Sequence, residues 1–265
     1  MFLSEISNTK WDLWNQCRLK YKYRYIDRYK GDPSASGDSL SFGTYIHEIF
    51  QLGVNAKSEH ELELIAEQIK AKHKISDSQK DRTKLCIRNF LNFNNMISKS
   101  ETIGTEIEFR LEEEKSKIIF TGIIDRVLRS STGTYMVIDY KTSKREKTKA
   151  TLFHDPQLQG YCYAVAKEYK IPLEEVSKKI ICAHYYPLTN NFVHISYTKP
   201  ILLQHLGKIV ETSWSIRKAK LDDLTPRRNE FCNNCEFRCL CPLYTDTVQI
   251  NNRILLEESR KEKSH

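Results

Sequence analysis

Long apolar runs and an export signal are both missing from this sequence. No stretch of eighteen or more apolar residues occurs, which excludes an ordinary membrane-spanning helix. The first residues, MFLSEISNTKWD, lack the basic segment followed by an apolar segment that marks a secretion signal. Internal repeats and low-complexity tracts are absent as well. We therefore expect a globular, intracellular (cytoplasmic) protein of one or two domains that does not use a membrane.

Charge and cysteine are the two features that the composition does supply. The chain has 42 Lys and Arg against 34 Asp and Glu, a formal net charge of +8, which favours a polyanionic partner without identifying one. Four of the eight cysteines lie in 232-CNNCEFRCLC-241. Because a reducing cytosol disfavours disulfides, this cluster is better interpreted as a metal or cluster site. The other four are each more typical of simple burial: Cys17, Cys86, Cys162 and Cys182.

The periodicity of apolar residues changes from helical to strand-like near residue 100. Helices are expected over 7–29, with Ser7 as the cap, then from about 43, over 59–73 and over 78–99. Strands are expected over 105–112, 118–128 and 135–142, as a three-stranded meander. A helix over 157–170, strands over 179–186 and 191–198, and a helix over 200–220 follow. The sequence predicts an α/β (α+β) fold, and residues 246–265 read as a charged tail.

The turn between the second and third expected strands places two acids opposite each other. If it is centred on Thr132, with Gly133 in the left-handed position, Asp125 faces Asp139. A bulge in this hairpin would shift the register by one residue. Within the third strand Asp139 and Lys141 share a face and Tyr140 points to the other, because side chains alternate along a strand.

Two carboxylates about 5 Å apart repel each other by roughly 3 kcal/mol at an effective dielectric of 20. A divalent cation removes this cost, and paired carboxylates are typical ligands of Mg²⁺ or Mn²⁺ that leave room for a substrate phosphate. With Lys141 on the same face, the arrangement suits metal-assisted hydrolysis of a phosphodiester. The alternative is a solvated strand face on which Asp139 and Lys141 form an ordinary surface ion pair.

Four motifs follow one another in a recognisable order. They are 43-GTYIHE-48, which contains His47, then 122-GIIDR-126, 138-IDYKT-142 and 157-QLQGY-161. In this order and spacing they resemble the RecB-like branch of the PD-(D/E)xK nuclease superfamily. The resemblance implies a restriction-endonuclease-like core with a mixed central sheet flanked by helices and a helical N-terminal insertion. It also implies one nuclease domain over 1–245, with a helical part to about 100 and a catalytic core over about 101–225.

The resemblance also implies a role for each matching position. Asp125 and Asp139 would be carboxylate ligands of the catalytic metal, His47 a further ligand, and the backbone carbonyl of Tyr140 would complete the site. Lys141 would position and polarise the attacking water. Gln157 and Tyr161 would orient Lys141 or the DNA backbone, and Glu106 is a weaker candidate for supporting the metal. Two departures from the family pattern are Ile124 in place of the proline that names the superfamily and Asp139 where many members have Glu.

The cysteines are similar to those of the AddB-type and CRISPR-adaptation nucleases. These relatives hold a 4Fe-4S cluster with one cysteine before the nuclease core and three after it. The resemblance implies Cys17 together with the 231–244 segment, from which it takes Cys232, Cys235 and Cys241, and the cluster would join the terminal segments. Cys239 can substitute for Cys241. The competing interpretation is a local Zn²⁺ site formed by the four clustered cysteines, although their last C-x-C gap is tighter than usual for zinc.

Basic residues near the cysteines are candidates for DNA contacts. The run 18-RLKYKYRYIDRYK-30 alternates Arg and Lys with Tyr. The basic side chains suit contact with phosphates, and the tyrosine rings suit stacking with nucleobases. A helix with a buried aromatic side and a solvated basic side has the same pattern, so both interpretations stay open. The candidates in this run are Arg18, Lys20, Lys22 and Arg24. The basic segment 141-KTSKREKTK-149, which directly follows the third strand of the meander, adds Lys144 and Arg145 as residues that would guide a DNA strand toward the metal.

The sequence therefore predicts a Mg²⁺- or Mn²⁺-dependent deoxyribonuclease, acting as an exonuclease on single-stranded ends. Its expected partners are DNA with free ends and proteins of recombination, repair or CRISPR adaptation. The alternative is an inactive, nuclease-like DNA-binding subunit of a recombination or repair complex.

Overall fold

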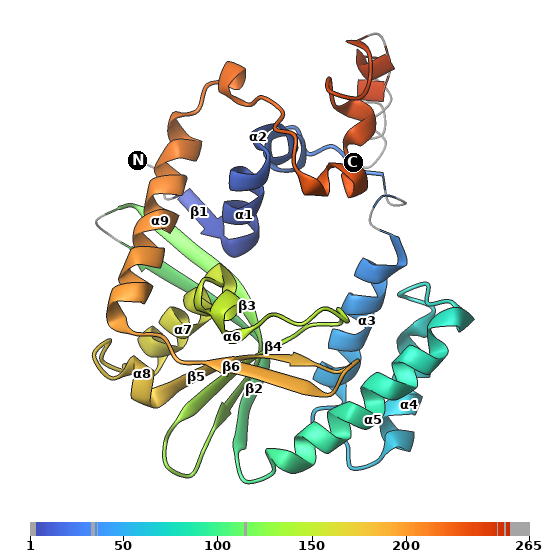
Figure 1. The fold of residues 1–265 in the computed structure, drawn as a ribbon, viewed down its shortest axis with the longest axis vertical. Helices are drawn as coiled ribbons and strands as arrows, with labels where there is room; N and C mark the ends of the chain where they lie inside the picture. The colour runs from blue at the N-terminus through green and yellow to red at the C-terminus, as the bar shows by residue number, and fades with distance from the viewer. Residues whose placement is uncertain are drawn as a thin grey trace. The chain divides into compact units, whose positions relative to one another are not determined.

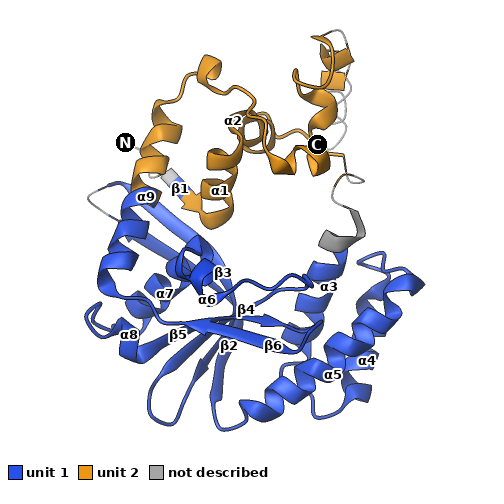
Figure 2. Cartoon of the chain, in the orientation of Figure 1, with its two compact units in different colours: residues 1–5, 38–208 blue, residues 6–37, 209–265 orange. Residues whose placement is uncertain are grey.

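The computed structural model describes residues 4–32, 35, 37–113, 116–247, 249–251 and 253–254. The chain forms two compact units (Figure 2). Unit 1 contains Met1–Glu5 and Asp38–Lys208, and unit 2 contains Ile6–Gly37 and Ile209–His265. Most of the predicted charged tail lies outside the described residues. No helix of the described chain is both long enough and apolar enough to cross a membrane.

A six-stranded mixed sheet organises unit 1 (Figure 1). Its order is β1-β3-β4-β5-β6, and β2 also pairs with β3. The meander of β2 (Glu101–Glu113), β3 (Ile118–Arg129) and β4 (Tyr135–Tyr140) is antiparallel, as the sequence predicted. β4 pairs in parallel with β5 (Ile180–Tyr186), which pairs antiparallel with β6 (Asn191–Ile195).

Helices cover both faces of this sheet. On one face α3 (Gly37–Leu52), α4 (Glu59–Lys70) and α5 (Lys80–Met96) bury an apolar core with Ile138, Tyr140 and Tyr185. On the other face α6 (Lys149–Phe153), α7 (Pro156–Glu168) and α8 (Val176–Lys179) pack with Val137 and Cys182. Alternate residues of one strand thus enter different cores, because successive side chains of a strand point to opposite faces.

Several boundaries differ from the sequence predictions. α3 begins at Gly37 rather than near residue 43, and β4 ends at Tyr140, so Lys141 already lies in the following loop. Three short elements escaped prediction because they have too few residues for a periodic pattern: β1 (Ser4–Ser7), α6 and α8. A 3-10 turn, η3 (Asp77–Gln79), precedes α5. α9 (Lys199–Lys218) matches the last predicted helix closely.

Unit 2 corrects the prediction of one continuous helix over 7–29. Ser7 caps α1 (Asn8–Gln16) as expected, because its side chain accepts a hydrogen bond from the Lys10 N–H. The helix then breaks at Cys17, whose backbone is extended (φ −160°, ψ 111°). α2 (Arg18–Tyr21) and a π-helical turn, η1 (Lys22–Ile26), follow. The break places Cys17 between two helices rather than within one.

The C-terminal part of unit 2 is built from short 3-10 turns. These are η4 (Leu221–Asp223), η5 (Glu230–Asn234) and η6 (Arg238–Leu240). Phe237 and Leu240 from this part pack against Leu19 and Tyr23 from the N-terminal helices. Tyr23 also donates a hydrogen bond of 2.9 Å from its hydroxyl to the Leu240 carbonyl oxygen. The two ends of the chain therefore share one small core.

Candidate active site

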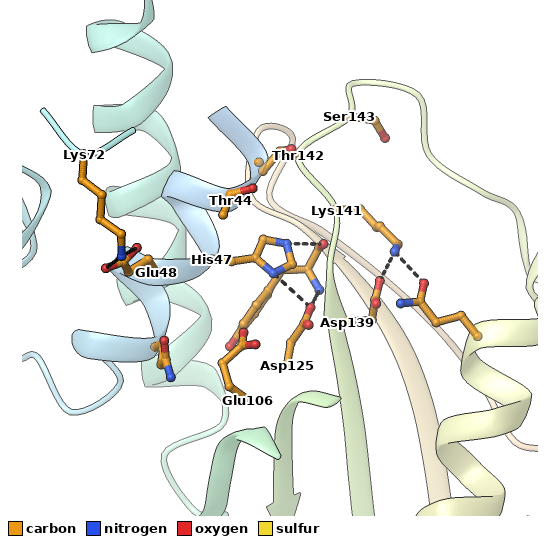
Figure 3. A pocket seen from close by; sticks show the side chains of 14 residues that line it. Thr44, His47, Glu48, Lys72, Glu106, Asp125, Asp139, Lys141, Thr142 and Ser143 are labelled. Carbon is orange, nitrogen blue, oxygen red and sulfur yellow. Dashed lines mark hydrogen bonds and ion pairs between the residues drawn. The ribbon is translucent and has the colours of Figure 1, made fainter. Parts of the chain in front are cut away.

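A cavity of about 660 Å³ opens in unit 1 beside the end of β4 (Figure 3). Most of the residues predicted to act together line it. The lining includes His47, Glu106, Asp125, Asp139, Tyr140, Lys141 and Gln157. Thr44 and Glu48 of α3 and Ser143 of the loop after β4 add further polar groups to its walls.

The β3–β4 hairpin brings Asp125 to this cavity. Arg126 pairs with Ile138 and Val127 with Val137, which is the register predicted from the turn, and Gly133 has the expected positive φ of 78°. Continued by one step, this register sets Asp125 against Asp139. Asp125 Oδ2 accepts a hydrogen bond of 2.7 Å from the Tyr140 N–H. Both acids are buried, with exposures of 8% and 1%.

His47 and Glu106 approach Asp125 from two other elements. His47 lies on α3, with Nε2 2.9 Å from the Tyr140 carbonyl oxygen and Nδ1 3.5 Å from Asp125 Oδ2. Glu106 lies opposite Asp125 in β2, between the pairs Thr105–Arg126 and Ile107–Ile124. One ligand atom each of His47, Glu106 and Asp125 falls within 4.8 Å of the others, the only such group of three among the described residues.

The backbone at Glu106 is strained, with a φ of 48°. A non-glycine residue in this left-handed region costs about 1–3 kcal/mol and persists only where its surroundings hold it. This conformation accompanies the placement of the Glu106 carboxylate in the cavity. The alternating sequence pattern of a regular strand does not predict this left-handed conformation of Glu106.

Electrostatics tie these three groups together. Burial alone would lower the pKa of His47, but the hydrogen bond and charge of Asp125, with Asp139 and Glu106, outweigh it and raise the pKa to about 9. Burial, the charge of Asp125 and the opposing charge of His47 act on Glu106, and its pKa is raised. Imidazole nitrogen and carboxylate oxygen are donors that Mg²⁺ and Mn²⁺ accept, so the trio fits a divalent cation.

Asp139 belongs to a second half of the site. Its Oδ2 lies 2.5 Å from Lys141 Nζ, which also donates a hydrogen bond of 2.9 Å to Gln157 Oε1. Gln157 in turn donates a hydrogen bond of 2.7 Å to the Tyr161 hydroxyl. Burial raises the pKa of Asp139 and the Lys141 ammonium opposes that rise. Gln157 and Tyr161 of α7 thus hold Lys141 beside Asp139.

Sequence reasoning missed a buried group behind Asp139. His184 of β5 pairs with Asp139 of β4, is fully buried, and places Nε2 3.5 Å from Asp139 Oδ2 and 3.7 Å from Asp155 Oδ2. Asp155 also forms an ion pair of 2.6 Å with Lys147. Burial lowers the pKa of His184 to about 4, so the ring is neutral. The available signal was one histidine within the apolar strand predicted over 179–186.

The cysteines of unit 2 surround a cavity of about 30 Å³. Four of them line it: Cys17, Cys232, Cys235 and Cys241. Cys239 instead lines a different pocket, with Asp32 and Glu236. All eight cysteines are free thiols, and among the described residues no three of them bring their sulfurs within 4.8 Å. Burial raises the pKa of Cys235 and of Cys241.

The basic residues proposed to contact DNA have varied surroundings. In unit 2, Lys22 forms an ion pair of 2.5 Å with Asp27, Arg24 pairs with Glu236, and Arg18 lies over the Trp14 ring. Tyr21 and Tyr23 are buried, so neither ring offers a free face for base stacking. Lys20 borders the cysteine cavity. In unit 1, Lys144 and Arg145 are exposed in the loop after β4.

Comparison with solved structures supports the fold. The chain is 14% identical to a crystal structure from Eubacterium rectale named "Putative exonuclease", with a TM-score of 0.55 over 88% of this chain and 87% of the other. At this identity the likeness concerns the fold alone. A second structure, SSO0001, is 19% identical over 86% of this chain and 96% of its own, with a TM-score of 0.36, too low for an argument. No curated protein matches the chain.

A family model decides the relationship. The model of the PD-(D/E)XK nuclease superfamily matches residues 5–242, which include the sheet, the cavity with its carboxylates and the cysteine segment. The mixed sheet flanked by helices agrees with the restriction-endonuclease-like fold of that superfamily. This chain belongs to the PD-(D/E)XK nuclease superfamily.

Proposed function

We propose that the protein is a Mg²⁺- or Mn²⁺-dependent deoxyribonuclease that acts as an exonuclease with a preference for single strands. The observation that carries the proposal is the convergence of His47, Glu106 and Asp125 beside the Asp139–Lys141 pair in one open cavity. A purely structural ion pair on a strand face needs no histidine and no third carboxylate.

Each residue has a role that its surroundings support. His47, Asp125 and Asp139 ligate the cation, with the Tyr140 carbonyl oxygen beside His47 Nε2 as a further donor and Glu106 as a supporting carboxylate. Lys141 reaches the cavity from the loop after β4 and orients the attacking water and the phosphate. Gln157 and Tyr161 fix the position of its ammonium group. The cation supplies Lewis-acid stabilisation of the charge that develops on the phosphate.

The preference for DNA ends rests on His47 and on the loop after β4. The helical histidine is the feature that the exonuclease-type members share, and the Eubacterium rectale structure of similar fold carries an exonuclease name. The exposed Lys144 and Arg145 stand in the same loop as Lys141 and suit contact with a phosphate backbone. Proteins of recombination, repair or CRISPR adaptation are the proposed partners.

We further propose that Cys17, Cys232, Cys235 and Cys241 hold a 4Fe-4S cluster. These four line one cavity, whereas Cys239 faces another, which favours Cys241 as the fourth ligand. A single zinc ion with Zn–S bonds near 2.3 Å requires sulfurs less than about 4 Å apart. A cluster of four irons takes one thiolate on each iron and tolerates wider spacing, in keeping with sulfurs that do not converge within 4.8 Å.

One comparison tests the catalytic proposal. Anaerobically purified protein is incubated with end-labelled single- and double-stranded DNA and Mn²⁺ or Mg²⁺, beside Asp139→Ala and Lys141→Ala. We expect release of labelled mononucleotides or short fragments, faster from single strands, and a loss on the order of 10²–10³-fold in each variant. Equal degradation by wild type and variants contradicts the proposed site. DNA binding without cleavage by the wild type indicates the inactive binding subunit instead.

A further inference from the structure

A buried ring nitrogen without a hydrogen-bond partner lies beside the Asp139–Lys141 pair. His184 Nε2 is inaccessible to solvent and has no hydrogen-bond partner in the described structure. Its two nearest acceptors are Asp139 Oδ2 at 3.5 Å and Asp155 Oδ2 at 3.7 Å, both beyond a normal hydrogen bond. Buried polar atoms are nearly always paired, so an unpaired one at an active site calls for an explanation.

The neighbours of His184 indicate which ring nitrogen carries the proton. The Tyr186 oxygen lies 3.2 Å from His184 Nδ1 and accepts a hydrogen bond of 2.9 Å from the Lys147 N–H. The Tyr186 hydroxyl proton is therefore available to His184 Nδ1. If Nδ1 accepts it, the neutral ring must carry its own proton on Nε2, the nitrogen that faces the two carboxylates.

The two carboxylates differ in how fully they are occupied. Asp155 caps α7, because its Oδ1 accepts from the backbone N–H groups of Gln157 and Leu158, and its Oδ2 pairs with Lys147. Asp139 Oδ2 has Lys141 Nζ at 2.5 Å and no other hydrogen-bonding partner. If Lys141 moves to substrate, Asp139 becomes the acceptor in need of a donor.

We propose that His184 is a positioning residue that replaces Lys141 as the hydrogen-bond donor to Asp139 Oδ2 when Lys141 engages the substrate. The inference rests on the proposed function, in which Lys141 serves the reacting phosphate and Asp139 ligates the cation. His184 Nε2 is 3.5 Å from Asp139 Oδ2, so a shift of a few tenths of an ångström brings it within hydrogen-bonding distance. The donor then holds Asp139 in one orientation, with its other oxygen directed to the metal. No proton is transferred in this exchange.

Hydrogen bonds to a metal-ligating carboxylate typically change metal affinity or activity by about 10–100-fold. The test measures Mn²⁺ binding to full-length protein by isothermal titration calorimetry, for wild type, His184→Phe and His184→Gln, each saturated with a single-stranded DNA whose phosphorothioate linkages resist cleavage. Phenylalanine fills a similar volume without a donor, whereas glutamine keeps an N–H near the position of Nε2. In the DNA-bound proteins we expect weaker Mn²⁺ binding in His184→Phe by about 10-fold or more, and rescue to within about threefold in His184→Gln. Titrations without DNA are the control, because Lys141 then still pairs with Asp139 and the three proteins should bind Mn²⁺ alike.

A second readout separates positioning from a structural role. Both substitutions remove the acceptor Nδ1 of the Tyr186 hydroxyl, so the thermal midpoint of the metal-free protein should fall by a similar amount in His184→Phe and His184→Gln, while only His184→Phe loses Mn²⁺ affinity. A purely structural role predicts lower midpoints with normal Mn²⁺ affinity in both folded variants. In cleavage assays the apparent KM for Mn²⁺ should rise in His184→Phe more than kcat falls.

Each outcome can be assigned. If Asp125→Ala abolishes Mn²⁺ binding while His184→Phe binds as the wild type does, the role of His184 is wrong and the metal site stands. If the wild type binds no Mn²⁺ and cleaves no DNA, both proposals are wrong. If His184→Gln is as impaired as His184→Phe, the N–H is not what matters and the positioning role is overturned.

Discussion

The carboxylate cavity of unit 1 and the cysteine cavity of unit 2 are built in different ways. In unit 1, strand register and helices on both faces of a sheet hold charged groups next to each other, so the surrounding fold supports the site. In unit 2, four cysteines line a cavity of about 30 Å³ over a small core joined from both ends of the chain. A small core supplies little stability, so this unit is expected to depend on the 4Fe-4S cluster that we propose for it. The fold supports the first site, whereas the proposed cluster would itself stabilise the unit that contains the second.

The largest expected effect comes from removing one cysteine. Cys17→Ser should abolish iron binding and lower the thermal midpoint of the anaerobically purified protein by about 10 °C, because a metal bound only by the folded state contributes its binding free energy to folding. Iron content and calorimetry measure both quantities. Cys239→Ser is the matched control, and iron loss in this variant would make Cys239, not Cys241, the fourth ligand.

The next effect is a dependence of metal-free stability on pH that belongs to unit 1. The pKa of His47 rises from an ordinary value near 6.5 to about 9 in the folded protein. The stabilisation is therefore complete below pH 6.5 and is lost as the pH rises through 9. With allowance for the partly exposed ring, we expect a loss of about 2–3 kcal/mol between pH 6.5 and 10. Chemical denaturation with chelator present should show the loss in wild type and a flat profile in His47→Gln.

In Glu106→Gln the affinity for Mn²⁺ should fall while the thermal stability of the protein stays the same. The amide keeps the shape of the side chain and removes one carboxylate from the trio, so Mn²⁺ binding should weaken by about tenfold. The strained backbone at Glu106 is unaltered, and the thermal midpoint of the metal-free protein should stay within about 1 °C of wild type. Normal Mn²⁺ affinity would assign Glu106 to the cavity wall rather than to the cation.

The smallest effect tests the hairpin that sets Asp125 against Asp139. Gly133 has a φ of 78°, and a methyl group added there would meet no atom within 4 Å. Gly133→Ala should therefore cost only the backbone strain, about 1 kcal/mol, and lower the midpoint by about 2–4 °C. Thr132→Ala, one residue earlier, is the control for the turn surface. A shift in Mn²⁺ affinity with Gly133→Ala would mean that the turn also adjusts the register.

The accuracy of the sequence predictions follows the range of the interactions involved. The hairpin register was predictable because turn chemistry acts over a few residues. Asp139 and Lys141 do lie side by side, but the strand ends at Tyr140 and Lys141 reaches Asp139 from the loop. The break of the first helix at Cys17 was not predictable, because residues 7–29 keep helical periodicity through it. The left-handed backbone of Glu106 had no local signal either, since glutamate seldom adopts it. The one-domain organisation stays a prediction beside the two compact units.

By itself the sequence determined the meander, the order of the motifs and the residue types at the site. Only the tertiary structure decided which of them meet: His47 from α3 with Asp125, Gln157 from α7 with Lys141, and His184 from β5 with Asp139. Contacts of this kind depend on how helices pack on the faces of the sheet. A periodic sequence pattern predicts a helix or a strand, but it does not predict which distant residue each side chain contacts. The local sequence therefore determines which chemical groups the site contains, and the packing of the core determines their geometry.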